Sequence, residues 1–447
     1  MKKVFLILLA MVLAISLGVV GCEPGDNGDE IPPQPDKIVV GMSKSETGPL
    51  ADIHWAAAYP IVATMVPQIN AAGGVLLKEY GATYKVPVET IIYDDGSDVG
   101  IMIENTVKLI TVDEVDYLWG ATGTAMISAQ APVANVYKKV LMTMEGGATF
   151  IKDDEIPFLP YLFVTLSFSD WYQLPVWADM LAEAGAETAF IAYIDDEHGL
   201  EYTEVATEEF ARVGINITGT PFPMGYDFTA FDTVIAAAQT SGADVFCVFA
   251  YPPQNMPLLG EAIETPYNPN AIIFGPGANF GFFPFFAGYE PSDMEGVSCF
   301  AVANRATSAA MSDMFDAIEA TMDGVLGPPP GFPGAWFLDW WGHPLYWAMV
   351  QIWQEAVEEV GYVSQDGLKD VLAASSPANP FTTILGPTWY TMFPPGGGIL
   401  AYECHTGQIG QWQSEIVEIV GYDGVEDDLT NYVVTANFTY PKPAWPS

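Results

Sequence analysis

Two kinds of segment alternate along residues 37–281. Short apolar runs rich in β-branched and aromatic residues, such as 37–43 and 243–251, predict β-strands. Stretches with helical spacing lie between them, such as 201–214, which ends on Gly214, a residue typical of helix C-termini. Helix-length connections favour parallel pairing of the strands, and the alternation occurs twice over. The pattern predicts an α/β fold with two doubly wound parallel-sheet lobes joined by crossover strands.

The first 36 residues follow a different pattern. Lys2 and Lys3 precede an apolar run at 4–20 that is short for a membrane-spanning helix, as expected of a signal peptide. The small residues before Cys22 resemble a bacterial lipobox, which implies cleavage before Cys22 and acylation of its thiol. An ordinary secretory signal with an incidental cysteine is the alternative. Residues 23–36 are rich in proline, glycine and acids and predict a flexible tether.

Composition narrows the class of protein. Fourteen Lys and Arg stand against 56 Asp and Glu, a net charge of −42, and such a surface repels nucleic acid and anionic lipid. Half of the residues are apolar, which is enough for a large core and excludes wholesale disorder. Because no apolar stretch after the tether is long enough to span a bilayer, we expect a soluble extracytoplasmic body held to the membrane by lipid alone.

Signatures of catalysis are absent from the sequence. It contains no HExxH, GxSxG, CxxC or phosphate-binding loop motif. The histidines are scattered, without metal-ligand spacing: His54, His198, His343 and His405. We therefore expect a protein that is not an enzyme, with no catalytic residue, metal or cofactor. His198 is interpreted as a surface or hinge-side residue rather than a catalytic base.

The cysteines beyond Cys22 are Cys247, Cys299 and Cys404. An extracytoplasmic compartment permits disulfides, but an odd number leaves at least one thiol free, and the sequence does not pair the others. Cys247 lies inside an apolar run and is interpreted as a buried small hydrophobic residue.

Junctions between strands and helices are the places where open parallel sheets bind ligands. Four segments lie at such junctions: 119–126, 146–150, 250–254 and 275–281. At the first, Thr122, Gly123 and Thr124 stand where larger side chains would bury more surface. We interpret this choice as room for a bound molecule. A helix cap and a tight turn that bind nothing are the alternative.

Several segments together resemble one family. They are KIVVGMSKSETGPLA, INAAGG, IIYDDGSD, GATGTAMISAQAPVA, MEGGATF, DFTAF and FGPG, in this order. The set is similar to the type I periplasmic binding proteins, specifically the branched-chain amino-acid receptors of ABC importers. The resemblance covers residues 37–281, whereas the match is weak over 282–447.

The resemblance implies a binding site between the lobes. In that family a ligand carboxylate meets a helix N-terminus, and the matching positions here are Thr122, Gly123 and Thr124. A second contact to the ligand head group matches Ala148 and Thr149.

Aromatic residues and the absence of one acid indicate which chemical class of ligand to expect. By position, Tyr251 matches a family aromatic at the end of a second-lobe strand, and Trp55 lies near another. Both are candidates to pack the ligand, although either residue fits an ordinary core role. Gly277 stands where amino-acid receptors of the family commonly place an acid against the ligand ammonium. Asp195 or Asp227 is an alternative acid in principle. We expect a small carboxylate or amide with an apolar or aromatic body rather than a zwitterionic amino acid.

The resemblance also implies the domain plan and the function. The expected divisions are a signal peptide at 1–21, a lipidated cysteine and linker at 22–36, a first lobe of 37–160 plus about 282–390, and a second lobe of 161–281 plus about 391–447. Closure of the lobes on a small ligand would present it to an ABC permease at the periplasm or cell surface. A ligand-sensing receptor of the same fold and a lipid-anchored hydrolase or adhesin are the alternatives.

Overall fold

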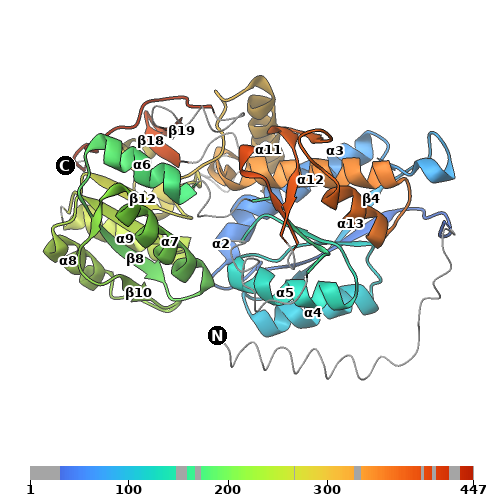
Figure 1. The fold of residues 1–447 in the computed structure, drawn as a ribbon, viewed down its shortest axis with the longest axis horizontal. Coiled ribbons are helices and arrows are strands. Elements are labelled where there is room, and N and C mark those ends of the chain that lie inside the picture. The colour runs from blue at the N-terminus through green and yellow to red at the C-terminus, as the bar shows by residue number, and fades with distance from the viewer. Residues whose placement is uncertain are drawn as a thin grey trace.

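The structure, a computed structural model, describes residues 31–146, 159–166, 173–265, 267–326, 334–393, 397–404, 409–421 and 433–445. They form two lobes that lie side by side, each with a central sheet between helices (Figure 1). Both sheets are mostly parallel. The predicted α/β fold with two doubly wound lobes is confirmed.

The first lobe is built on a seven-stranded sheet. Its strand order is β16 (Tyr390–Met392), β17 (Gly398–Leu400), β7 (Leu162–Val164), β6 (Leu141–Thr143), β5 (Tyr117–Trp119), β1 (Ile38–Lys44) and β4 (Val88–Asp94). All neighbours are parallel except β16, which is antiparallel to β17. Its helices are α2 (Ala51–Ile53), the π-helix η1 (His54–Ala58), α3 (Tyr59–Ala71), α4 (Val99–Thr111), α5 (Thr124–Val136), α11 (Ala309–Leu326), α12 (Gly342–Val360) and α13 (Gln365–Ala373).

The second lobe is built on an eight-stranded sheet. Its order is β10 (Phe222–Met224), β8 (Thr188–Ile194), β11 (Val245–Phe249), β12 (Ala271–Phe274), β13 (Val297–Phe300), β18 (Ile409–Gln413) and β19 (Ile416–Val420), with β9 (Asn216–Ile217) beside β8. The last two strands are antiparallel additions to a parallel sheet. Its helices are α6 (Leu174–Ala184), α7 (Glu197–Val213), α8 (Phe231–Ser241), α9 (Pro252–Glu264) and α10 (Phe283–Phe286).

The chain crosses between the sheets later than the expected boundaries at 160, 281 and 390. Strand β7 still belongs to the first sheet, β13 to the second, and β17 to the first again. The crossings therefore follow residues 164, 300 and 400. The largest difference concerns β13, whose position is set by pairing with β12 and β18, and such pairing between distant segments leaves no local mark in the sequence.

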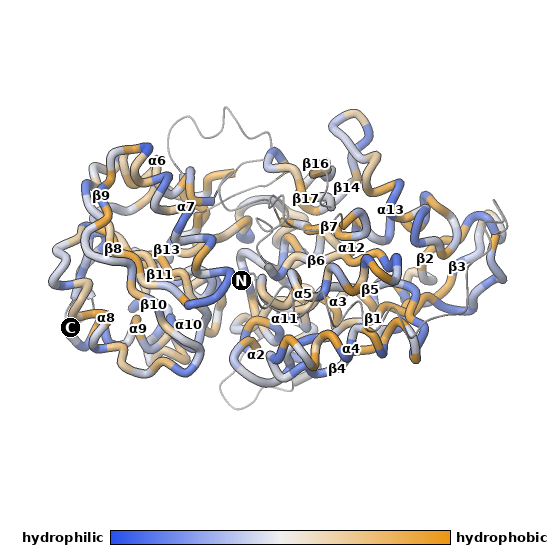
Figure 2. The backbone as a smooth tube through the Cα atoms, turned by 60° about the horizontal axis from the view of Figure 1, so that its bottom comes forward, coloured by the Kyte–Doolittle hydropathy of each residue, from blue (hydrophilic) through white to orange (hydrophobic). Residues whose placement is uncertain are grey.

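The apolar runs of the sequence form the central strands, which are buried because helices cover both faces of each sheet. Every residue of β11 is buried, as expected of a parallel strand with helices on both faces of its sheet. Hydrophobic segments gather inside each lobe in Figure 2, and hydrophilic segments lie mostly at its outer surface. Helix starts follow local rules, because Asp98 caps α4 by accepting from Ile101 N at 2.9 Å. The predicted stop at Gly214 is confirmed by its left-handed backbone after α7.

Two further expectations concern cysteines and membrane spans. Within the described ranges Cys247, Cys299 and Cys404 are all free and buried, and burial raises the pKa of the Cys247 thiol to about 12. None of the helices described combines the length and apolar character needed to cross a bilayer. The expected signal peptide, Cys22 and most of the tether lie outside the described residues.

Candidate ligand-binding site

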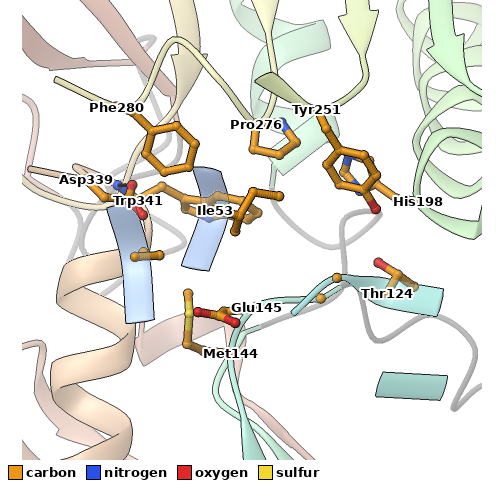
Figure 3. Close-up of a pocket in the computed structure, with 14 residues that line it drawn as sticks. Ile53, Thr124, Met144, Glu145, His198, Tyr251, Pro276, Phe280, Asp339 and Trp341 are labelled. Atoms are coloured by element: carbon orange, nitrogen blue, oxygen red, sulfur yellow. Dashed lines mark hydrogen bonds between the residues drawn. The ribbon is translucent and has the colours of Figure 1, made fainter. Parts of the chain in front are cut away.

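A small cavity lies between the lobes, where several strands of both sheets end (Figure 3). Its volume is about 30 Å³, enough for roughly one or two water molecules. It is lined by Ile53, Ala57, Gly123, Thr124, Met144, Glu145, Gly146, His198, Tyr251, Pro276, Phe280, Asp339, Trp341 and Gly342. These residues come from both lobes and from the segment before α12. The cavity therefore occupies the position where open parallel sheets bind ligands.

The first lobe contributes the start of helix α5. Gly123 precedes the helix with φ +94° and ψ 153°, a backbone conformation that side chains rarely adopt. A Cβ there would lie 3.3 Å from Cδ1 of Leu50 and 3.7 Å from the Tyr251 hydroxyl. No side chain caps the helix, and Thr124 at its first turn lines the cavity. The glycine therefore allows the opposite lobe to approach the positive end of the helix dipole.

A buried polar cluster, defined as Lys44, Thr122 and Glu145, lies beneath this helix start. The Lys44 ammonium contacts Oε2 of Glu145 at 2.6 Å, and both side chains are 1% exposed. The Thr122 hydroxyl donates to the same oxygen at 2.9 Å. Burial raises the pKa of the Glu145 carboxyl, while Lys44 and Thr122 act in the opposite direction. The cluster places one buried ion pair at the edge of the cavity.

The second lobe contributes an aromatic wall, defined as His198, Tyr251 and Phe280. Tyr251 follows β11, and its ring stacks on His198 at 5.1 Å and on Tyr226 at 6.1 Å between centroids. Burial lowers the pKa of His198, so its imidazole is neutral near pH 7. Figure 3 shows these rings along one side of the cavity, opposite Thr124 and Glu145. The wall therefore offers apolar faces without a fixed charge.

The segment before α12 contributes a second buried carboxyl group. Oδ1 of Asp339 accepts hydrogen bonds from Nδ2 of Asn279 at 2.8 Å and from N of Trp341 at 2.9 Å. Burial raises the pKa of Asp339 to about 7, and the negative charge of Glu145 adds to this effect. Two carboxyl groups, of Glu145 and Asp339, thus line one small cavity.

The lobes also contact each other directly beside the cavity. The Ser128 hydroxyl on α5 donates to Oε2 of Glu197 at the start of α7, at 2.7 Å. The two helices belong to different lobes. Together with the approach of Tyr251 to Gly123, this bond describes a closed arrangement of the lobes.

The predicted site residues fall into three groups: those at the cavity, those outside the described residues, and those that are described but do not line the cavity. Gly123, Thr124 and Tyr251 line the cavity, and Thr122 lies behind it with its hydroxyl on Glu145. Ala148, Thr149 and the lipidation position Cys22 lie outside the described residues.

Two predicted contacts are not brought to the cavity. The Trp55 indole donates to the Glu46 carbonyl at 3.0 Å and packs on Tyr59, and it is not part of the lining. Gly277 lies next to the lining residue Pro276, and its N–H donates to Asn279 at 2.7 Å. Its φ of +151° explains the glycine without a ligand.

Sequence reasoning missed several lining residues. Glu145 had a usable signal, because it immediately precedes the junction at 146–150. Asp339 and Trp341 had none, since they lie in the weakly matching part of the chain and are positioned by contacts with Asn279 and α12. Within the described part of the chain, no group of three or more His, Cys, Asp or Glu is arranged to hold a metal ion.

Comparison with known families agrees with this architecture. Residues 37–396 match the family described as periplasmic binding protein. The chain belongs to this family, whose members bind ligands and are not enzymes. The expectation that the protein is not an enzyme is therefore confirmed.

Solved structures share the fold at low sequence identity. The leucine binding protein LivK of Thermotoga maritima has 14% identity and a TM-score of 0.64, covering 86% of this chain and 97% of that one. LivJ of Streptococcus pneumoniae, in complex with isoleucine, has 17% identity and a TM-score of 0.65, covering 91% and 100%. A solute binding protein of an ABC transporter from Rhodopseudomonas palustris, in complex with benzoate, has 15% identity and a TM-score of 0.67, covering 92% and 98%.

Proposed function

We propose that this protein is an extracytoplasmic substrate-binding protein that delivers a small ligand to an ABC permease, anchored to the membrane by a lipid on Cys22. The ligand carries a carboxylate or amide head on an apolar or aromatic body. One observation carries the proposal: a cavity between two lobes combines the start of α5 on one side with the aromatic wall on the other.

The head group is assigned to the first lobe. Helix α5 begins at the cavity without a side-chain cap, and the positive end of its dipole favours a negative or carbonyl oxygen there. Thr124 adds a hydroxyl at the same place. The body of the ligand then packs on the aromatic wall, where burial of apolar surface contributes most of the affinity.

The ligands of two structural relatives fit this division. Isoleucine and benzoate, seen in the relatives from S. pneumoniae and R. palustris, each join a carboxylate to an apolar body. These structures support the proposed class of ligand.

Closure is the step that couples binding to delivery. Isoleucine and benzoate are larger than the cavity of about 30 Å³, so the lobes have to part to admit such a ligand, and the lining side chains have to rearrange around it when the lobes close again. A ligand that bridges the two walls then shifts the population towards closed lobes. The bond between Ser128 and Glu197 forms only when α5 and α7 meet, so it belongs to the closed form.

Mass spectrometry of the protein tests the proposal directly. The purified chain is denatured and the released small molecules are identified, and a thermal-shift panel of amino acids, aromatic carboxylates and amides is measured beside it. We expect a released or stabilising ligand with a polar head and an apolar body. Absence of any released molecule, together with no stabilisation by any member of the panel, would contradict the proposal.

A further inference from the structure

One oxygen of the buried carboxylate in the polar cluster has no donor. Oε2 of Glu145 accepts from both Lys44 and Thr122. Oε1 of the same group is buried and has no hydrogen-bond partner among the described residues. The side chain is 1% exposed and lines the cavity. Figure 3 shows its carboxylate in the floor of the cavity.

An unpaired oxygen of this kind is costly in a folded protein. Buried polar atoms are almost always hydrogen-bonded, because an atom removed from water without a new partner loses its hydration. The cost is largest for an ionised group, and Glu145 is in ionic contact with Lys44. The unpaired oxygen of Glu145 lies at a wall of the cavity, where a ligand can supply the missing donor.

The charges around the cavity select the kind of donor. Lys44 balances Glu145, while Asp339 adds a second carboxyl group with no cation in contact among the described residues. A ligand that presents only a carboxylate would meet acceptors and negative charge at this wall. A ligand with a nitrogen donor would satisfy Oε1 without that repulsion.

We propose that Glu145 is a specificity-determining residue whose Oε1 accepts a hydrogen bond from an N–H group of the ligand, supplied by an amide or an amine. This inference rests on the proposed function and deepens it. The oxygen of the ligand head faces the start of α5, the N–H group faces Glu145, and the apolar body lies on the aromatic wall. A simple carboxylate fills two of these positions and leaves the third empty.

Matched pairs of probes test the inference on the wild-type protein. Benzamide is compared with benzoate, and leucine with 4-methylpentanoate, because the members of each pair share a body and differ in the N–H group. Titration calorimetry gives the ratio of the two dissociation constants in each pair. We expect the N–H member to bind about tenfold more tightly or better, as for a hydrogen bond to a charged acceptor. Equal or tighter binding of the carboxylate member overturns the inference. Benzylamine, as a third arm, separates an amine from an amide.

If none of the probes binds, the ligand that the protein releases on denaturation provides the test of the inference. A released molecule that contains N–H supports the inference, whereas one without N–H overturns it and leaves the proposed function intact. No released molecule and no binding of any probe overturns the proposed function, and the inference with it.

Variants connect the preference to Glu145. Replacing the ion pair by Lys44→Met with Glu145→Leu removes the acceptor without leaving an unpaired charge. We expect the ratio of dissociation constants to fall about tenfold, to near one. Asp95→Asn is the control, since Asp95 is a buried carboxylate of the same lobe that accepts from Ser43 and Ser45 and does not line the cavity. It should leave the ratio unchanged, and an equal loss of preference in both variants overturns the assignment.

Discussion

The two walls of the cavity differ in how they are held. The first lobe presents a polar wall in which Lys44, Thr122 and Glu145 fix one another by bonds of 2.6 and 2.9 Å. The second lobe presents rings that stack at 5.1 Å and carry no fixed charge, as between His198 and Tyr251. Directional bonds define the position of a head group, whereas stacked rings tolerate bodies of different shape. Selectivity for the head group therefore depends on the first lobe, whereas affinity for the body of the ligand depends on the second lobe.

Disrupting the polar wall should reduce the stability of the protein more than any other change considered. Lys44→Met leaves Glu145 charged and buried without its partner, and we expect a loss of about 3–5 kcal/mol in the free energy of unfolding. Tyr251→Phe on the opposite wall keeps the stacked ring and should cost less than about 1.5 kcal/mol. Urea denaturation of both variants provides the measurement. Similar losses in the two variants would show that the walls are not held differently.

The pH dependence of stability sharpens the description of Asp339. Its pKa of about 7 in the folded protein lies above the ordinary value of 3.8, so between these values the folded chain holds a proton that the unfolded chain has lost. The stabilising contribution is therefore complete below pH 3.8 and is lost as the pH rises to about 7, by at most about 1.4 kcal/mol per pH unit.

Denaturation at several pH values checks this sign. The free energy of unfolding is compared between the wild type and Asp339→Asn from pH 4 to pH 8. We expect the difference between the two proteins to change steadily up to pH 7 and then to level off. A difference that stays constant over this range would contradict the expectation.

The close approach of the walls is tested at Gly123. Alanine there must adopt φ +94° with ψ 153° and meets Leu50 at 3.3 Å, so we expect a loss of about 1–3 kcal/mol and weaker ligand binding. Gly185→Ala is the matched control, because Gly185 also has a positive φ, of +90°, but has no atom within 4 Å of the new Cβ and is not among the residues that line the cavity. Calorimetric unfolding and titration should show a binding defect only at Gly123.

The contact between the lobes gives the smallest expected effect. Ser128→Ala removes the bond to Glu197 and should disfavour closure by about 1 kcal/mol, or about fivefold in apparent affinity. Thr207→Ala serves as the control. Thr207 lies on α7, the helix of Glu197, and the substitution removes an exposed hydrogen bond from its hydroxyl to the Thr203 carbonyl. Small-angle scattering with and without ligand measures the degree of closure. Unchanged scattering and affinity in Ser128→Ala would show that this bond does not contribute to closure.

Much of the fold was predictable because the signals are local. Strand β11 is an uninterrupted apolar run, helix α4 begins at a capping aspartate, and α7 ends at Gly214. The start of α5 was predictable as a candidate site, because small residues at the end of a strand are unusual in a core and are typical of a binding junction. Trp55 and Gly277 have contacts within the protein that the positional argument did not include, with the Glu46 carbonyl and the Asn279 amide oxygen respectively.

By itself, the sequence determined the alternation of strands and helices, the two lobes and the strand end where Gly123 and Thr124 line the cavity. These follow from periodicity, capping and glycine conformation, which act between near neighbours. Only the tertiary structure decided that Lys44, Thr122 and Glu145 meet, because their positions lie up to 101 residues apart. It also brought Asp339 to the same cavity, and burial there raised the pKa of its carboxyl. The charges that face a ligand therefore depend on long-range packing, which no local pattern records.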